Sequence, residues 1–189
     1  KLTSSIIEIS DRDVIFSNSG FWDDGDFANI GGVVEIDLIE KKLKNIYNAQ
    51  NTNVLGGFDG VYTDLANMYS VINQVKLHNG EVWIVNPFNE SSGYVLSSYN
   101  ILSDTWSGAN IHDSFLNEDL HLYVPQEVAF DNSGQLWVGF DYRTSYSDGG
   151  IRYINSNGQF TEVDNDEILV GGDHSDVWSI DICSYNELD

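Results

Sequence analysis

Glu127-Val-Ala-Phe-Asp-Asn-Ser-Gly-Gln-Leu-Trp-Val-Gly139 is the stretch of sequence that decides the fold. Apolar and polar side chains alternate on both sides of a polar turn at 131–134, which is the period of a half-buried β-strand. The stretch Gln74-Val-Lys-Leu-His-Asn-Gly-Glu-Val-Trp-Ile-Val85 has the same form with a shorter turn. Two strands joined by a tight turn therefore occur at least twice, and the sequence predicts strands rather than amphipathic helices.

These two stretches are copies of one repeat. Val75 and Leu77 lie 53 residues before the matching residues Val128 and Phe130. Trp83 and Trp137 take the same place in each copy, where we expect them to pack between repeats. Near the C-terminal end of the chain, further matches lie at Ile180, Ile182 and Leu188. Near the N-terminal end, Ile7, Ile9 and Val14 match Val75, Leu77 and Val82 at an offset of 68 residues.

A third strand follows each copy, and a fourth strand follows the third. The third strands are expected at 31–36, 92–96 and 149–154, and the fourth at 43–46, 105–106 and 160–163. A repeat of about 50 residues with four short strands is typical of a β-propeller blade. We therefore predict an all-β fold of about three and a half four-stranded antiparallel blades. They are placed at residues 5–47, 70–107 and 123–164, with the start of a fourth at 176–189. The alternative is a β-sandwich in which similar strands recur by chance.

The third repeat resembles a known family. Phe130-Asp-Asn-Ser-Gly-Gln-Leu-Trp-Val-Gly139, followed by Gly149-Gly-Ile151, resembles the repeat of bacterial two-component-regulator-type propellers. Asp176-Val-Trp-Ser-Ile180 is similar to the opening of the next repeat in that family. The same core also resembles streptogramin-lyase-like and gluconolactonase-like propellers. The resemblance implies a sensor ectodomain or a part of a secreted or cell-surface protein, in the periplasm or outside the cell.

The predicted number of blades is too small for a closed propeller, in which the blades form a ring. A closed propeller has at least about 4 blades, and an incomplete one leaves sheet edges and apolar faces open. We therefore expect the chain to be a piece of a longer propeller protein. The alternative is a homodimer in which two copies of about three and a half blades complete a ring of about seven.

The charge of the chain excludes several classes of partner. The 189 residues include 8 Lys and Arg against 30 Asp and Glu, a formal net charge of −22. Binding to nucleic acid requires clustered basic residues, and so does docking on an anionic membrane. No apolar run approaches the roughly 20 residues of a membrane-spanning helix. We expect no nucleic-acid partner and no membrane insertion of this segment.

Long connections are predicted at one end of every blade. The second and third strands are joined at 17–31, 86–92 and 141–149, and successive blades are joined at 47–70 and 107–124. The remaining turns are short and fall at the opposite end. Long loops on a rigid scaffold are where binding surfaces are usually built.

Aromatic residues in these loops stand beside acids and amides, as in a ligand-binding surface. The predicted ligand-binding residues are Phe21, Trp22, Phe88, Asn89, Tyr142 and Tyr146. Aromatic faces ringed by hydrogen-bonding groups suit a small molecule, a glycan or a protein segment. The alternative is that the aromatic side chains pin the loops onto the sheets.

Three acidic residues within four positions of the first loop are the candidate metal site. Asp23, Asp24 and Asp26 offer the oxygen ligands that calcium takes, although the stretch lacks the spacing of an EF-hand loop. The alternative is a solvated acidic turn. Apart from this calcium ion, no cofactor is expected.

Catalytic signatures are not found in the sequence. His78, His112, His121 and His174 are scattered, and there is neither a nucleophile elbow nor a phosphate-binding loop. We therefore expect a non-catalytic ligand-binding, sensory or scaffold module of a larger bacterial envelope or secreted protein. Two alternatives are kept. One is a structural or adhesive module. The other is a metal-dependent hydrolase like the gluconolactonases, in which Glu127 would be a metal ligand.

Overall fold

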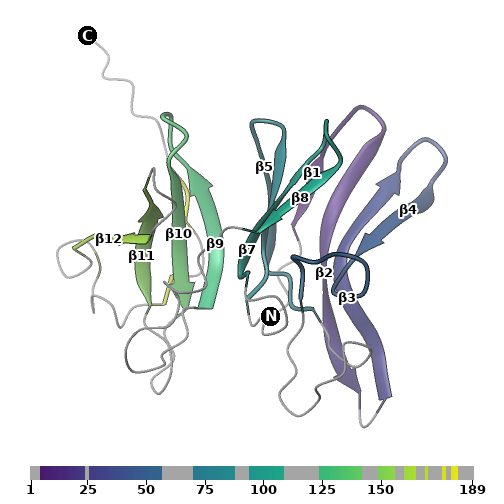
Figure 1. The fold of residues 1–189 in the computed structure, drawn as a ribbon, viewed down its shortest axis with the longest axis horizontal. Helices are drawn as coiled ribbons and strands as arrows, with labels where there is room; N and C mark the ends of the chain where they lie inside the picture. The colour runs from purple at the N-terminus through teal and green to yellow at the C-terminus, as the bar shows by residue number, and fades with distance from the viewer. Residues whose placement is uncertain are drawn as a thin grey trace. The chain divides into compact units, whose positions relative to one another are not determined.

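The structure of the chain is a computed structural model, and all the regular structure that it describes is β-strand (Figure 1). The described residues are 5–23, 26–56, 70–87, 94–108, 124–141, 149–155, 160–164, 169, 176–177 and 180–182. Within these ranges no helix occurs. The prediction of an all-β fold is confirmed for this part of the chain, while the arrangement of blades in a ring stays a prediction.

The described strands form three antiparallel sheets, each built from four strands that are adjacent in the sequence. Sheet 1 contains β1 (Ile6–Glu8), β2 (Asp13–Asp23), β3 (Asp26–Asp37) and β4 (Lys42–Tyr47). Sheet 2 contains β5 (Gln74–His78), β6 (Glu81–Val85), β7 (Leu96–Asn100) and β8 (Thr105–Gly108). Sheet 3 contains β9 (Val124–Phe130), β10 (Leu136–Asp141), β11 (Gly150–Ile154) and β12 (Phe160–Glu162). The chain divides into two compact units, Lys1–Asn110 with sheets 1 and 2 and Ile111–Asp189 with sheet 3.

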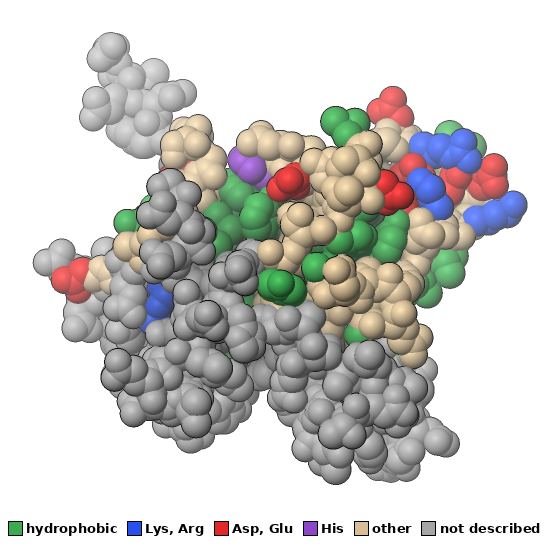
Figure 2. All heavy atoms as spheres, in the orientation of Figure 1, with side chains coloured by type: hydrophobic (Ala, Val, Ile, Leu, Met, Phe, Trp, Pro, Cys, Tyr) green, Lys and Arg blue, Asp and Glu red, His purple; other side chains and the backbone are tan. Residues whose placement is uncertain are grey.

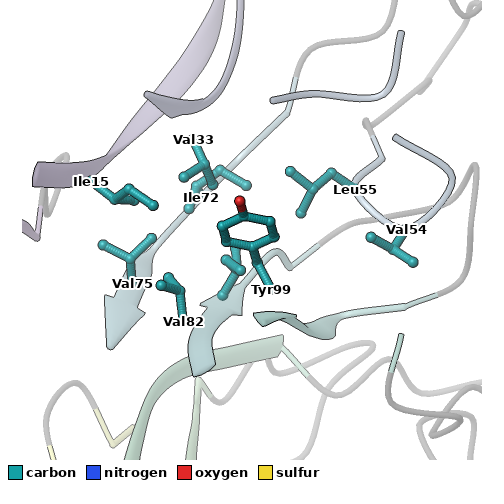
Figure 3. Close-up of a cluster of buried hydrophobic side chains, with 9 residues drawn as sticks. Ile15, Val33, Val54, Leu55, Ile72, Val75, Val82 and Tyr99 are labelled. Atoms are coloured by element: carbon teal, nitrogen blue, oxygen red, sulfur yellow. The ribbon is translucent and has the colours of Figure 1, made fainter. Parts of the chain in front are cut away.

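The core of the first unit lies between the faces of sheets 1 and 2 (Figure 3). Sheet 1 contributes Ile15 and Val33, and the connection between the sheets contributes Val54, Leu55 and Ile72. The residues from sheet 2 are Val75, Val82, Ile84 and Tyr99. Full burial of an aliphatic side chain of this size stabilises a fold by about 1.5–3 kcal/mol, so this cluster holds the two sheets together.

The first strand differs from its predicted register. Glu8 pairs with Val14 and Ile7 pairs with Ile15, so Ile7 lies on the same face as Ile15. In sheet 2 it is Leu77 that pairs with Val82. The match of Ile7 and Ile9 to Val75 and Leu77 is therefore wrong by one residue. The cause is the turn at 9–12, which is longer than the turn of Asn79 and Gly80 and is closed by a 3.0 Å bond from the Ile9 N–H to the Asp13 carbonyl.

The predicted loop at 17–31 is also wrong, because β2 and β3 continue through it as one hairpin. The ladder runs from Asp13 opposite Asp37 to Asp23 opposite Asp26, with a register shift between Phe21 and Asp23. The polar run Asn18-Ser-Gly20 indicated a loop. The sequence signal for the hairpin is Asp24-Gly25, since Asp-Gly is a favoured two-residue hairpin turn.

In sheet 3, the turn between β9 and β10 is organised by one carboxylate. One oxygen of Asp131 accepts hydrogen bonds from the Ser133 N–H at 2.8 Å, the Ser133 hydroxyl at 2.6 Å and the Gln135 N–H at 3.0 Å. The other oxygen accepts one from the Trp137 indole at 3.1 Å. The hydroxyl of Ser133 and the indole of Trp137 are the main causes that lower the pKa of Asp131 to about 2.

Replacing Asp131 with alanine should lower the stability of the protein at neutral pH. It should also remove part of the loss of stability that the protein shows as the pH falls. A carboxylate whose folded-state pKa is lowered from 3.8 to about 2 contributes stability that is present above pH 3.8 and lost as the pH falls through about 2. The urea midpoint of Asp131→Ala should therefore lie below that of the wild type at pH 7. The gap should close as the pH approaches 2. An unchanged gap at that pH, or an equal effect of Asn132→Ala at the exposed neighbouring position, would contradict this role.

Residues 176–177 and 180–182, at the predicted start of a fourth repeat, contact sheet 3. The Val177 N–H donates to the Phe140 carbonyl at 2.9 Å, and Val177 is buried. The Ile180 N–H reaches a Glu127 carboxylate oxygen at 3.3 Å. The described residues here, 176–177 and 180–182, are not in a strand, and 183–189 lie outside the described residues.

Candidate functional site

Each sheet has a turn end and a loop end. At the turn end, strands are joined at 9–12, 38–41, 79–80, 101–104 and 131–135. The loop end is where β2 meets β3, β6 leads to β7 and β10 leads to β11, and the connections from β4 to β5 and from β8 to β9 also start there. Apart from the hairpin of β2 and β3, the connections at the loop end are longer than those at the turn end.

Most of the predicted site residues lie outside the described residues. Asp24, Phe88, Asn89, Tyr142 and Tyr146 are all in this group. Phe21, Trp22 and Asp23 belong to β2 and Asp26 belongs to β3, and of these four the structure describes the backbone. The register places Asp23 opposite Asp26 at the tip of the hairpin. The calcium site and the ligand-binding set stay predictions.

Asn86 is the residue at the loop end of sheet 2 that sequence reasoning missed. Its side chain is fully buried. The carboxamide oxygen accepts a hydrogen bond from the Gly56 N–H at 3.0 Å, and the amide nitrogen donates to the Val71 carbonyl at 2.9 Å. Its backbone N–H donates to the Val95 carbonyl at 2.9 Å. Asn86 thus anchors the base of two connections, and the Asn-Pro sequence after a strand was the available signal.

The connection after β4 begins as a packed turn. The Asn48 side-chain oxygen accepts the Gln50 N–H at 2.9 Å, and the Asn51 side chain accepts the Asn48 N–H at 2.9 Å. Val54 and Leu55 then enter the core between the sheets. The described part of this long connection is therefore held to the scaffold by both polar and apolar contacts.

The loop end of sheet 3 is built around a buried arginine. Arg152 is 2% exposed, and its guanidinium donates to the Gly149 carbonyl at 2.8 Å. The guanidinium carbon also lies 5.2 Å from the centre of the Phe140 ring, a cation–π geometry. Asp141, at the end of β10, is buried as well. Both ends of the predicted loop at 141–149 are thus anchored in the sheet.

A second polar group lies on the face of sheet 1 that meets sheet 2. Glu35 is 4% exposed, and its carboxylate accepts hydrogen bonds from the Lys44 ammonium at 2.7 Å, the Asn45 amide at 2.9 Å and the Tyr47 hydroxyl at 3.0 Å. Lys44 also reaches Asp13 at 3.0 Å. Hydrogen bonding to Glu35 is the main cause that raises the pKa of Lys44.

An aromatic cluster adjoins this polar group and joins the two sheets. The rings of Tyr47, Tyr99 and Trp106 lie between 5.0 and 5.7 Å apart. Burial, and then the charge of Glu35, raises the pKa of Tyr47. Lys44, Asn45 and Tyr47 are hydrogen-bonded to Glu35, and the aromatic rings join the two sheets, so the arrangement supports the packing of sheets 1 and 2.

Charged side chains gather over the turn end of sheet 1, where blue and red atoms lie side by side in Figure 2. Arg12 forms an ion pair with Asp37 and contacts Glu40 at 3.3 Å. The Glu40 backbone N–H and the Arg12 side chain lower the pKa of Asp37. The ion pairs in this region that involve half-exposed groups are worth at most about 1 kcal/mol each.

Among the described residues, no cluster of three or more His, Cys, Asp or Glu residues that could hold a metal ion occurs. Glu127, the predicted metal ligand of the hydrolase alternative, accepts the bond from Ile180. His78 lies beside Asn79 in the turn of β5 and β6, with 2.9 Å between their side-chain nitrogens.

Comparison with known proteins gives no family. The chain matches no protein-family model, and no curated protein matches it. Among the residues that the structure describes, no helix is long and apolar enough to cross a membrane.

Proposed function

We propose that the chain is a set of β-propeller blades that acts as a non-catalytic ligand-binding module of a larger bacterial envelope or secreted protein. The order of strands supports the blades, because each sheet is an antiparallel meander of four consecutive strands. The face-to-face packing of sheets 1 and 2 around Ile15 and Val82 supports them further. The bacterial origin and the periplasmic or extracellular location rest on the resemblance of the third repeat.

The observation that carries the binding function is the difference between the two ends of the sheets. The turn ends are closed by short hydrogen-bonded turns, such as the one around Asp131. The loop ends carry the longer connections, and buried polar residues anchor them at Asn86 and Arg152. Variable loops held at their bases by a rigid scaffold are the usual site of recognition.

The proposed ligand is a neutral glycan. Predicted loop residues such as Trp22 and Tyr142 offer aromatic faces, which stack on the apolar faces of sugar rings. Amides such as Asn89 complete the surface with hydrogen bonds to hydroxyl groups. A net charge of −22 repels anionic ligands, which favours an uncharged one.

Titration with cellohexaose, maltohexaose and chitohexaose tests this function. We expect the tryptophan fluorescence to change with at least one of them. Trp22→Ala and Tyr142→Ala should each weaken that binding about tenfold, the equivalent of about 1.4 kcal/mol. Leu102→Ala is the matched control, because Leu102 is 94% exposed on a turn at the opposite end of sheet 2.

Three results would contradict the proposal. No binding of any of the three sugars at millimolar concentration would exclude a neutral glycan of these types. An equal loss of affinity in Leu102→Ala would exclude the loop end as the binding surface. Hydrolysis of glucono-1,5-lactone in the presence of calcium or zinc would favour the hydrolase alternative over a non-catalytic module.

A further inference from the structure

One face of sheet 1 is apolar apart from Glu8, and it is exposed at its two edge strands, β1 and β4, whereas Val34 on β3 is buried. The residues on it pair across all four strands, in the series Ile6, Phe16, Val34 and Ile46 and in the series Glu8, Val14, Ile36 and Leu43. We call these eight residues the outer face of sheet 1. Ile6 is 68% exposed, Leu43 58% and Ile46 39%. A sheet face that stays in water normally carries polar residues, so this face is suited to be covered.

Sheet 2 has a face equivalent to the outer face of sheet 1, and in the structure sheet 1 covers it. In sheet 2, Val82 and Ile84 stand on either side of Trp83 in the sequence, and they point at Ile15 and Val33 of sheet 1. In sheet 1, Val14 and Phe16 stand on either side of Ile15 in the same way. The outer face of sheet 1 is therefore the equivalent of the sheet 2 face that sheet 1 covers.

The matching partner face occurs on sheet 3. Trp137 takes the place of Ile15 in its sheet, and it pairs with Ala129 on one side and Tyr153 on the other. The Trp137 and Tyr153 rings lie 5.2 Å apart, and both side chains are half-buried, whereas Ala129 is buried. We call the face with these three residues the tryptophan face of sheet 3. It corresponds to the face of sheet 1 that packs on sheet 2.

The tryptophan face already accepts an apolar side chain from the chain itself. Val177 lies over Gly139, where a Cβ atom would come within 2.6 Å of the valine methyl group. The place of Val177 in its repeat is that of Ile72, which is fully buried between sheets 1 and 2. The same residue position therefore packs on the same type of face in both units.

We propose that the chain associates head to tail with a second copy of itself, so that the outer face of sheet 1 packs on the tryptophan face of sheet 3 of the other copy. The contact repeats the one between sheets 1 and 2 across two molecules. It is heterologous, because two different surfaces meet. The proposal extends the predicted homodimer by naming its two faces, and it is independent of any ligand at the loop end.

Two features of the chain weaken the proposed contact between copies. Glu8 lies on the outer face where sheet 2 has Leu77, so one carboxylate interrupts an otherwise apolar surface. The net charge of −22 repels the second copy at low ionic strength. We therefore expect association to strengthen with added salt, and to strengthen again in Glu8→Leu.

Sedimentation velocity from micromolar to millimolar concentration tests the proposal. The wild type should associate, and Ile46→Glu should raise the dissociation constant by at least about tenfold. Leu102→Glu adds the same charge at a position that is 94% exposed on a turn of sheet 2 and belongs to neither face, and it should leave association close to that of the wild type. The urea midpoint of each variant establishes that it is folded. A wild type that is folded and monomeric at every concentration would overturn the proposal.

A mixing experiment separates this contact from a symmetric one. Tyr153→Glu blocks the tryptophan face and Ile46→Glu blocks the outer face, so each variant alone should associate at least about tenfold more weakly than the wild type. An equimolar mixture should form a one-to-one complex, because each variant keeps the face that the other lacks. If Tyr153→Glu alone still forms dimers, the outer faces associate with each other and the head-to-tail contact is wrong.

Discussion

Gly32→Ala should lower the free energy of unfolding by about 2–5 kcal/mol, the sum of backbone strain and overpacking. Gly32 has a φ of 131°, in a region that residues with a side chain rarely adopt. A Cβ atom built there would lie 2.2 Å from the Tyr47 carbonyl oxygen and 3.0 Å from Cβ of Asn48. The oxygen belongs to the backbone at the end of β4, so relief of the clash requires β3 and β4 to separate where Val33 pairs with Tyr47.

Gly80→Ala is the matched control for this substitution. Gly80 also has a positive φ, of 80°, but no atom lies within 4 Å of the position of a Cβ atom. Its cost should be limited to the left-handed backbone conformation, about 1–2 kcal/mol. Urea unfolding followed by circular dichroism measures both variants. Equal losses of stability would mean that β3 and β4 do not approach each other closely at Gly32.

The first two strands of sheets 2 and 3 could be predicted because their sequence signals are local, whereas the third strand of sheet 2, expected at 92–96, is β7 at Leu96–Asn100. Alternating residues such as Val75 and Leu77, bounded by Asn79 and Gly80, indicate a strand and its turn without reference to the rest of the chain. The structure places both residues in β5, paired with Ile84 and Val82. This alternation is strong because one face of the sheet packs on another sheet.

The errors in sheet 1 arose where pairing partners decide the structure. Ile7 and Ile9 alternate correctly as a pattern, yet the length of the turn at 9–12 shifts the strand by one residue. A shift of one residue moves every side chain to the other face, and the sequence of one strand does not contain that information. A loop was predicted at 17–31 because polar residues in an extended hairpin resemble a loop. Here too, the pairing of the two strands decides the structure.

The anchoring residues could not be predicted because their partners are distant. Asn86 bonds to Gly56 and Val71, and Glu35 bonds to Lys44 across a β-bulge. A buried asparagine or glutamate looks like a solvated residue until its partners are known. The predicted ligand-binding residues rest on the composition and the position of the loops, and the binding experiment tests them.

Glu35→Ala should lower the free energy of unfolding by about 2–4 kcal/mol, because a buried carboxylate is removed from three donors. Lys44 is 44% exposed and retains Asp13, which keeps the loss below that of a fully buried ion pair. The matched control is Glu40→Ala. Glu40 is 52% exposed and bonds to Arg12 and Lys42 at 3.3 Å, so its loss should be at most about 1 kcal/mol.

The alkaline limb of the stability curve distinguishes a lost interaction from a general loosening of the core. The raised pKa of Tyr47 contributes stability that is present below the ordinary tyrosine pKa of about 10 and is lost as the pH rises above it. The charge of Glu35 is the second cause of that shift, after burial. Glu35→Ala should therefore flatten the fall of the urea midpoint above pH 10, and Tyr47→Phe should flatten it further. If Glu35→Ala destabilises the protein but leaves the alkaline slope unchanged, the carboxylate acts on the titration of neither Tyr47 nor Lys44, and its effect comes from its other contacts.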